Sequence, residues 1–258
     1  MAYYYKFIFK NLKNIIKGKI LKKSIDEIKS TITLRAEELI QRRDVTLKAL
    51  SANTIEEVVT NLKPYGFGNE IEKAYLMYKD TKEIGIIDTY LDKILYQNLA
   101  DNIKSKADLN LLKLFGTELD VYNLTNIVRA KFWNMDSQRI KELLVSHTAS
   151  TSDDLLSKMI DAENIKMSFM ELSKTKFVDI IPTEGNDIFM INEFETKLNI
   201  FLYNSLLKEF ANMFKLSTTV AVVRLYDYEI QNLASISYAV ENNIPTETTM
   251  TKIIAPVQ

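Results

Sequence analysis

The sequence predicts an all-α protein, and three observations support this prediction. Its 258 residues include 6 Gly and 4 Pro, whereas average usage would give roughly 18 and 13. Folds rich in hairpins or phosphate-binding loops use glycine at positive φ angles, so this scarcity argues against Rossmann and P-loop folds. Residue pairs with the spacing of helix caps recur along the chain, and apolar residues repeat at helical intervals.

The composition limits the classes of function to consider. Hydrophobic residues make up 47% and charged residues 26%, which is typical of a folded protein. Lys and Arg total 33 against 34 Asp and Glu, so the net charge of −1 supplies no overall attraction to nucleic acid or an anionic membrane. Without cysteine there is no thiolate nucleophile and no zinc–thiolate site, which fits a reducing cytosol.

The N-terminal stretch MAYYYKFIFK is apolar, but lysines interrupt it and the residues after it. No segment reaches the roughly 18 uncharged apolar residues that a membrane span needs. We therefore expect a chain that is neither secreted nor integral to a membrane.

Two residue pairs predict where helices begin in the first third of the chain. Ser24 with Glu27, and Thr54 with Glu57, have the spacing of a capping box. In such a box a hydroxyl and a carboxylate bind the free N–H groups of the first helical turn. Each pair therefore predicts the start of a new helix.

The stretch NTIEEVVTNLKPYGFG, residues 53–68, predicts a helix from about Ile55 that stops at Lys63. Pro64 disfavours helical geometry at the residue before it, and Gly66 and Gly68 are then expected to form a turn. The next helix is predicted over IGIIDTYLDKILYQNLADNI, residues 84–103. One of its faces carries Ile87, Leu91, Ile94, Leu95 and Asn98.

The second half of the chain shows one clear loop, IPTEGND around Pro182, followed by a long helix with apolar residues at helical spacing. These apolar residues are Phe194, Leu198, Phe201, Leu202 and Leu206. The stretch STTVAVVRLY, residues 217–226, contains a cluster of β-branched residues and is the one segment with strand character. We predict a helix there as well.

The first helix recurs later in the chain. Aligning KNLKNIIKGKIL, residues 10–21, with YNLTNIVRAKFW, residues 122–133, gives six identities over residues 9–28 at an offset of 112. The identical pairs are Asn11 and Asn123, Leu12 and Leu124, Asn14 and Asn126, Ile15 and Ile127, Lys19 and Lys131, and Ile28 and Ile140. Ser24 falls on Asp136, another capping residue type.

A weaker third copy, YEIQNLASISYAVENNIP, lies 109 residues after the second. It places Asn232, Leu233, Ile236 and Ala239 on Asn123, Leu124, Ile127 and Ala130. The shared pattern is an apolar stripe, small or polar positions that permit close helix contact, and a break about a dozen residues later. Three such units indicate a pseudo-threefold helical body, with approximate lobes at residues 1–105, 106–215 and 216–258.

The stretch ELDVYNLTNIVRAK, residues 118–131, resembles the helix repeated in the C subunit of V-type/A-type ATPases, the counterpart of the eukaryotic V-ATPase d subunit. Further stretches match that family in order: NLKNIIKGK, ANTIEEVVTNLKPYGFG, IDTYLDKILYQNL, FVDIIPTEG and YDYEIQNL. The chain is shorter than usual for the family. Its residues 31–47, TITLRAEELIQRRDVTL, also separate motifs that we would expect closer together.

The resemblance implies a non-catalytic subunit, shaped as a three-lobed helical funnel. Such a subunit sits peripherally on the cytoplasmic face of the membrane proteolipid (c/K) ring and accepts the D and F subunits of the central stalk. It transmits torque for ATP-coupled proton or sodium transport, and packed helices suit this because they are stiff. An unrelated all-helical scaffold or protein-interaction module is the alternative, and an unrecognised enzyme is a third possibility.

The candidate functional residues are charges that would meet a partner locally, namely Lys17, Lys19, Arg129, Lys131 and Glu229. The four basic residues recur at one spacing in two copies, whereas the third copy has Tyr238 and Val240 at the positions of Arg129 and Lys131. The alternative for each basic residue is a solvated charge on the outer side of a helix.

We expect no catalytic, cofactor-binding or metal-binding residue. His147 is the only histidine and is expected at the surface or in a cap. Adjacent carboxylates such as Glu37 and Glu38, or Asp153 and Asp154, point to different sides of a helix and do not form an acid/base pair. Trp133 and the tyrosine-rich start are expected to anchor a core or an interface.

Overall fold

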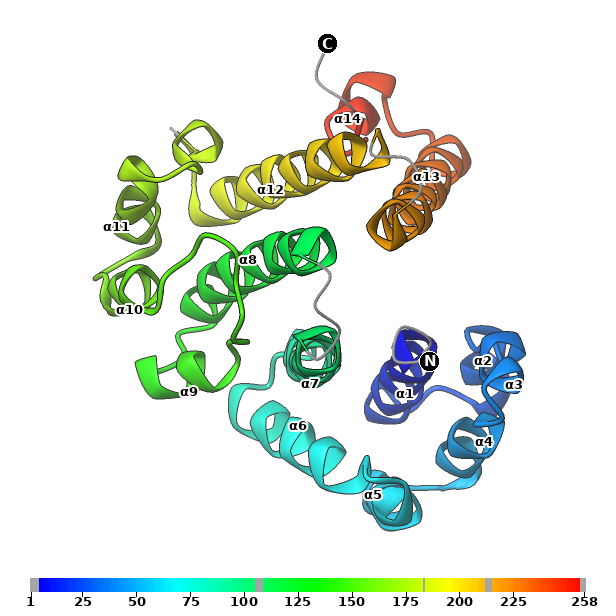
Figure 1. Cartoon of the computed structure of the whole chain (residues 1–258). Helices are drawn as coiled ribbons and strands as arrows, with labels where there is room; N and C mark the ends of the chain where they lie inside the picture. Colours follow the sequence, from blue (N-terminus) through cyan, green and yellow to red (C-terminus); the bar gives the residue numbers. More distant parts are fainter. Residues whose placement is uncertain (1–4, 105–108, 183, 212–214, 256–258) are drawn as a thin grey trace. The chain divides into compact units, whose positions relative to one another are not determined.

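The computed structural model describes residues 5–104, 109–182, 184–211 and 215–255, and every regular element in these ranges is a helix (Figure 1). The all-α prediction is therefore confirmed for this part of the chain. Tyr3 and Tyr4 of the tyrosine-rich start lie outside it. None of the helices described is long and apolar enough to cross a membrane. The chain divides into two compact units, residues 1–105 and 106–258.

In the first unit, the long helix α1 packs against α4, α5 and α7, and α6 packs against α5 and α7. Ile8, Phe9, Leu12, Ile15 and Ile16 of α1 are buried, which places the core of the unit along this helix. The elements are α1 (Tyr5–Ile20), α2 (Ile25–Ser30), α3 (Arg35–Leu39), α4 (Arg43–Ser51), α5 (Ile55–Leu62), the 3-10 helix η2 (Lys63–Tyr65), α6 (Gly68–Thr81) and α7 (Gly85–Lys104).

The predicted helix starts are confirmed, with one difference in bonding. Ser24 and Glu27 form the complete capping box of α2. Thr54 accepts a hydrogen bond from the Glu57 N–H at the start of α5, but the Glu57 carboxylate accepts from the N–H of Asn53, at 2.6 Å, instead of Thr54. In this second capping box, the carboxylate therefore binds the N–H of the residue before the N-cap and not the N–H of the N-cap itself.

The turn after α5 forms at Gly66, and the prediction that Gly68 is also part of this turn is wrong. Gly66 has a φ of 81°, a left-handed conformation that glycine adopts without steric cost. Gly68 is instead the first residue of α6. A Cβ atom at Gly68 would lie 2.5 Å from the carbonyl oxygen of Val59, so the close approach of α5 and α6 requires glycine there.

In the second unit, the long helix α8 packs against α10, α11 and α12, and α12 also packs against α13. The elements are α8 (Leu109–Phe132), α9 (Ser137–Glu142), α10 (Asp153–Asp161), α11 (Ile165–Met170), η3 (Glu171–Lys174), η4 (Val178–Ile180), α12 (Asp187–Phe210), α13 (Leu216–Glu241) and α14 (Thr246–Met250) (Figure 1). The stretch STTVAVVRLY lies in α13, which confirms the helix prediction, and the Pro182 loop separates η4 from α12.

The three aligned stretches end in the same way, which supports the internal repeat. Lys22, Asn134 and Asn243 occupy matching positions after α1, α8 and α13, and each has a positive φ, between 52° and 55°. The N–H of the next residue binds the carbonyl five positions back in each copy: Lys23 to Gly18, Met135 to Ala130, and Ile244 to Ala239. This is the Schellman motif that closes a helix C-terminus, followed each time by a short helix, α2, α9 or α14.

The segment 31–47 is part of this repeat and not an insertion into the first copy. Thr33 matches Val145, and Leu50 near the end of α4 matches Ile160 near the end of α10. Thr33 and Leu50 of the first copy are 17 residues apart, whereas Val145 and Ile160 of the second copy are 15 apart. The first copy is therefore longer by two residues here. A larger difference follows, because α6 of the first unit has no α-helical counterpart among the described residues between η3 and α12.

Candidate functional site

One asparagine in each copy binds the backbone of the residue 22 positions later, and we call this arrangement the asparagine clamp. Asn123 donates from Nδ2 to the carbonyl of Val145 and accepts the Val145 N–H at Oδ1, both at 2.9 Å. Asn11 makes the same pair of bonds with Thr33, at 2.9 and 3.2 Å. Asn232 makes them with Ile254, at 2.7 and 2.9 Å.

The sequence predicts that such polar positions permit close helix contact, and the clamp gives the asparagines a further role. Each one ties the long helix of its copy to the segment that follows the short helix, because it satisfies both backbone groups of one residue. Asn11 and Asn123 are buried, whereas Asn232 is half-buried. The small position next to the helix end does behave as predicted, because a Cβ atom on Gly18 would lie 2.6 Å from the Ile28 side chain.

Lys17 and Arg129 occupy the same position in the first two copies, and each forms an ion pair within its own unit. Lys17 on α1 lies 2.8 Å from Asp88 on α7. Arg129 on α8 binds Glu195 on α12 with two hydrogen bonds, from Nε at 2.5 Å and from Nη2 at 2.7 Å. In both units the cation therefore joins the first long helix of the copy to the last one. Two parallel bonds fix the geometry of the Arg129 pair more firmly than a lysine can.

Lys19 and Lys131 also occupy one aligned position, and each caps the C-terminus of a shorter helix in its own unit. Lys131 Nζ donates to the carbonyls of Ile160 and Ala162, at 2.7 and 2.6 Å, where α10 ends. Lys19 Nζ binds the matching carbonyls of Leu50 and Ala52 at the end of α4. Carbonyls at a helix C-terminus lack intrahelical partners and favour a positive charge. Burial lowers the pKa of both lysines, and a nearby carboxylate opposes this shift in each case.

The structure thus gives all four basic residues an intrachain partner, so none is an idle solvated charge. The third copy lacks both cations, because Tyr238 and Val240 replace them, and both of these side chains are exposed. Glu229, the fifth candidate, is exposed on α13 and has no hydrogen bond or ion pair among the described residues.

Several bonding residues were not predicted from the sequence. Asp120 is fully buried on α8, and its Oδ1 accepts hydrogen bonds from the N–H groups of Ser150 and Thr151 and from the Thr151 hydroxyl, at 2.8 to 3.1 Å. These bonds fix the loop that leads into α10. The only signal in the sequence was the acidic stretch ELD before the repeated asparagine. The carboxylates of Asp88 and Glu195 had no distinguishing pattern.

Glu37 was also not predicted from the sequence, and it bonds to Asn11 of the first clamp. Its Oε1 accepts hydrogen bonds from Asn11 Nδ2 at 2.7 Å and from Thr46 Oγ1 at 2.6 Å. Its Oε2 is buried and has no hydrogen-bond partner among the described residues. Burial raises the pKa of Glu37 above its usual value, although the two hydrogen bonds lower it. Glu38 is exposed and pairs with Arg43, so the two carboxylates do not act together.

We expect the stability of the chain to depend on pH through Glu37. Because the folded-state pKa is raised, the folded chain holds this proton more tightly than the unfolded chain. The stabilising contribution is therefore complete below the unfolded pKa, about 4.3, and is lost as the pH rises through the folded-state pKa. Glu37→Gln keeps a carbonyl acceptor for Asn11 and Thr46 and should remove this loss.

The measurement is urea unfolding followed by circular dichroism at a series of pH values above about 4.3. Glu37→Gln should show a flatter decline in the free energy of unfolding than the parent chain. Glu38→Gln, which removes a neighbouring exposed charge, serves as the matched control and should keep the parent slope. Equal slopes for the parent and Glu37→Gln would contradict the expected role of this carboxyl.

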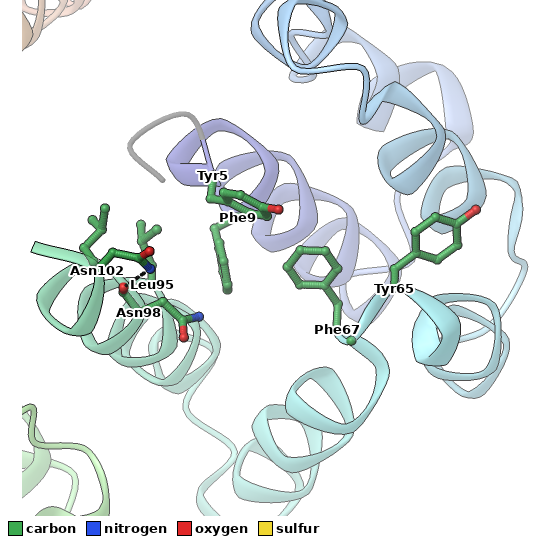
Figure 2. Close-up of a pocket in the computed structure, with 9 residues that line it drawn as sticks. Tyr5, Phe9, Tyr65, Phe67, Leu95, Asn98 and Asn102 are labelled. Carbon is green, nitrogen blue, oxygen red and sulfur yellow. Dashed lines mark hydrogen bonds between the residues drawn. The ribbon is translucent and has the colours of Figure 1, made fainter. Parts of the chain in front are cut away.

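The first unit also contains a pocket of about 420 Å³ at one end of α1 and α7 (Figure 2). Phe9 and Phe67 meet there edge to face, with ring centroids 5.5 Å apart. Asn98 and Asn102 lie on its α7 side, where the Asn102 amide donates to the Asn98 carbonyl at 2.7 Å. The described residues that line the pocket include no acidic or basic side chain. The pocket therefore offers aromatic and amide contacts, and we assign it no chemistry.

No group of three or more histidine or acidic side chains in the described ranges is placed to hold a metal ion. The polar residues with the most distinctive geometry instead connect helices: the three clamps, the two ion pairs and the two lysine caps. They form a braced helical framework, and such a framework is suited to transmitting force between surfaces.

The chain is similar to a family of known proteins over nearly its whole length. Residues 1–252 match the family model described as ATP synthase (C/AC39) subunit. The C subunit of the A-type ATP synthase of Methanosphaera stadtmanae is 22% identical over 235 residues, which cover 88% of this chain and 60% of that protein. The Pyrococcus horikoshii C subunit is 25% identical over 204 residues, covering 77% of this chain and 54% of the relative.

The Methanocaldococcus jannaschii C subunit is 31% identical over 141 residues, covering 53% of this chain and 34% of that protein. The chain therefore spans about half the length of the curated relatives it matches. No solved structure gives a significant match.

Proposed function

The chain belongs to the ATP synthase (C/AC39) subunit family, and from this membership we propose that it is a non-catalytic central-stalk subunit of a rotary V/A-type ATPase. In this role it links the D and F subunits of the stalk to the membrane proteolipid (c/K) ring. It is peripheral, on the cytoplasmic side of the membrane, and passes torque between the two during ATP-coupled proton or sodium transport.

The observation that carries this proposal is the match to the family model over residues 1–252. The relatives, each named as the C subunit of an A-type ATP synthase, support it. The braced framework is consistent with a subunit that must not deform under load, because close-packed helices have low compressibility. A three-lobed funnel, with approximate lobes at residues 1–105, 106–215 and 216–258, is part of the same proposal.

The proposal predicts that hydrolysis and transport become uncoupled when the chain is removed from its ATPase. Without the chain, the catalytic head should keep hydrolysing ATP, while ATP-driven ion uptake into membrane vesicles should fall to background. Adding the chain back should restore uptake and co-purification of the proteolipid ring. Full ion uptake by the complex without the chain would contradict the proposal.

The candidate interface residues can be tested within the same assay. Simple removal of Arg129 would break its ion pair with Glu195 and confound stability with assembly. We therefore exchange the two charges, Arg129→Glu with Glu195→Arg, which keeps an internal ion pair but reverses the charges that a partner would meet.

If Arg129 also faces a partner, the exchanged variant should melt within a few degrees of the parent but lose roughly tenfold or more in assembly with the ring or stalk. The matched control exchanges Lys158 and Asp154, an exposed ion pair on α10 at 2.7 Å, and should assemble normally. Normal assembly of the Arg129 exchange would show that this residue braces the fold only.

A further inference from the structure

The helices α4 and α10 occupy matching places in the first two copies but begin with different residues. Ser152 caps α10, because its hydroxyl accepts a hydrogen bond from the Leu155 N–H at 3.2 Å. The matching residue of α4 is Arg42, whose side chain makes no capping bond. Serine at this position stabilises a helix, whereas arginine does not satisfy the free N–H groups. The first copy therefore lacks a cap that the second copy has.

The charge of the next residue is also unfavourable for the start of α4. Its first residue is Arg43, where α10 has Asp153. A helix N-terminus carries a partial positive charge, which favours an aspartate and disfavours an arginine. Natural proteins break such local rules at functional sites. The two arginines therefore indicate that this end of α4 has a role other than stabilising the helix.

Arg42 and Lys48 both lie against the ring of Tyr65 on η2. The guanidinium carbon of Arg42 is 5.8 Å from the ring centroid, and Nζ of Lys48 is 5.2 Å from it. These cation–π contacts position the two charges but do not neutralise them. Arg43 pairs with Glu38 at 2.9 Å. Arg42 and Lys48, in contrast, form no ion pair with a carboxylate in the part of the chain that the structure describes.

Lys48 differs in this respect from its counterpart in the second copy. Lys158 pairs with Asp154, one turn earlier on α10, at 2.7 Å. The first copy has the same residue types, Asp44 and Lys48, at the matching positions of α4. Lys48 nevertheless lies over Tyr65 and not against Asp44. The same pair of residues therefore gives a neutralised lysine in one copy and an available cation in the other.

Exposed leucines lie beside these cations. Leu39 ends α3 and is 71% exposed, and Leu47 precedes Lys48 on α4 and is 41% exposed. The Glu38–Arg43 pair joins the two helices between them. We call Leu39, Arg42, Leu47, Lys48 and Tyr65 the α3–α4 surface.

The second copy does not expose apolar residues in the matching segment. Its residue at the position of Leu47 is Ser157, and every large apolar side chain of residues 133–160 is buried or half-buried. The helix α3 has no counterpart among the described residues between α9 and α10. The segment 31–47 therefore gives the first copy a surface of its own.

We propose that the α3–α4 surface binds an acidic amphipathic segment of a partner protein. Carboxylates of this segment pair with Arg42 and Lys48, and its apolar side chains cover Leu39 and Leu47. Two cations without carboxylate partners, next to exposed leucines, are complementary to a segment of this composition.

The exposed carboxylates near this surface favour a protein over a membrane or a nucleic acid. Glu38 and Asp44 are both exposed, and a continuous layer of phosphates would repel them. A protein can place its acidic residues opposite the two cations and away from these carboxylates. The inference concerns a partner of the first unit and does not depend on the proposed role in a rotary ATPase.

The test titrates the full chain into a fluorescein-labelled peptide of leucine and glutamate in an amphipathic helical pattern, at fixed ionic strength. Fluorescence anisotropy then gives the Kd. Arg42→Ser introduces the residue that caps α10 and removes the cation. We expect this variant to melt at a higher temperature than the parent and to bind the peptide about tenfold or more weakly. A residue that only supports the fold would not combine these two effects.

Three controls accompany this variant. Lys73→Gln, at an exposed lysine of α6, should leave the Kd unchanged. A peptide with glutamine in place of glutamate should bind the parent about tenfold or more weakly. Leu39→Ser with Leu47→Ser should weaken binding of the original peptide about threefold or more, because apolar contact is lost.

Several results would overturn the proposal. They are an unchanged Kd for Arg42→Ser, equal binding of the glutamine peptide, and no saturable binding of the original peptide in the millimolar range. Binding to vesicles of anionic phospholipid, lost in Arg42→Ser and without binding of the peptide, would assign the surface to a membrane instead. A dimer in sedimentation that Arg42→Ser abolishes would assign it to a second copy of the chain.

Discussion

Replacing Asn123 by Ala should lower the free energy of unfolding of the second unit by about 2 to 5 kcal/mol. Asn123 satisfies both the N–H and the carbonyl of Val145, and both residues are buried. Without the amide, two backbone groups lose their partners where water does not replace them, at about 1 to 3 kcal/mol each. The small cavity left by the side chain adds to this cost.

Urea unfolding followed by tryptophan fluorescence measures this effect, because the single tryptophan, Trp133, follows the last residue of α8. Asn232→Ala is the matched control, since it removes the same two bonds from a half-buried clamp. Water can replace those bonds in part, so we expect a cost of about 1 kcal/mol or less. Equal costs at Asn123 and Asn232 would contradict the view that burial sets the strength of the clamp.

Replacing Lys131 by Met should cost the second unit about 1 to 3 kcal/mol. Methionine keeps the apolar stem but removes the amine that binds the carbonyls of Ile160 and Ala162 at the end of α10. The amine is partly desolvated, as its lowered pKa indicates, so part of its attraction to the carbonyls is already offset. The remaining cost in stability comes from the two carbonyls at the end of α10, which lose their hydrogen-bond donor.

The same Trp133 measurement serves for this variant. Lys141→Met, at an exposed lysine in the last turn of α9, is the control and should stay within about 0.5 kcal/mol of the parent. We also expect the double variant, Lys131→Met with Asn123→Ala, to lose a free energy of unfolding close to the sum of the two single losses. The reason is that the two residues bond different segments. If Lys131→Met matches Lys141→Met, the lysine cap does not stabilise α10.

The fold class and the repeat could be predicted from the sequence because both depend on local patterns. The Ser24 box, the Pro64 stop and the recurrence of asparagine at Asn11, Asn123 and Asn232 are visible in the chain itself. The start of α6 could not be predicted, because a glycine such as Gly68 is compatible both with a turn and with close packing of two helices. The arrangement of three lobes depends on contacts between distant segments and stays a prediction.

The candidate site was less predictable, because the bonds of its clamps and lysine caps are made to the backbone. The residue held by each clamp is Thr33, Val145 or Ile254, and these share no side-chain chemistry. The recurrence of Lys19 and Lys131 is visible in the sequence, and their role as partner contacts stays a prediction. Their intrachain acceptors are carbonyls that any residue supplies, so the sequence contains no signal for these bonds.

The clamps also determine how the chain can reach its folded state. Each one closes over 22 residues, a short separation for which loop closure costs little entropy. No clamp needs residues from another copy, so the long helix, its Schellman end and the short helix can assemble in each copy from local contacts. Proteins dominated by local contacts fold fast. During synthesis, the Asn11 clamp can therefore close on the ribosome before the residues of the second unit have been made.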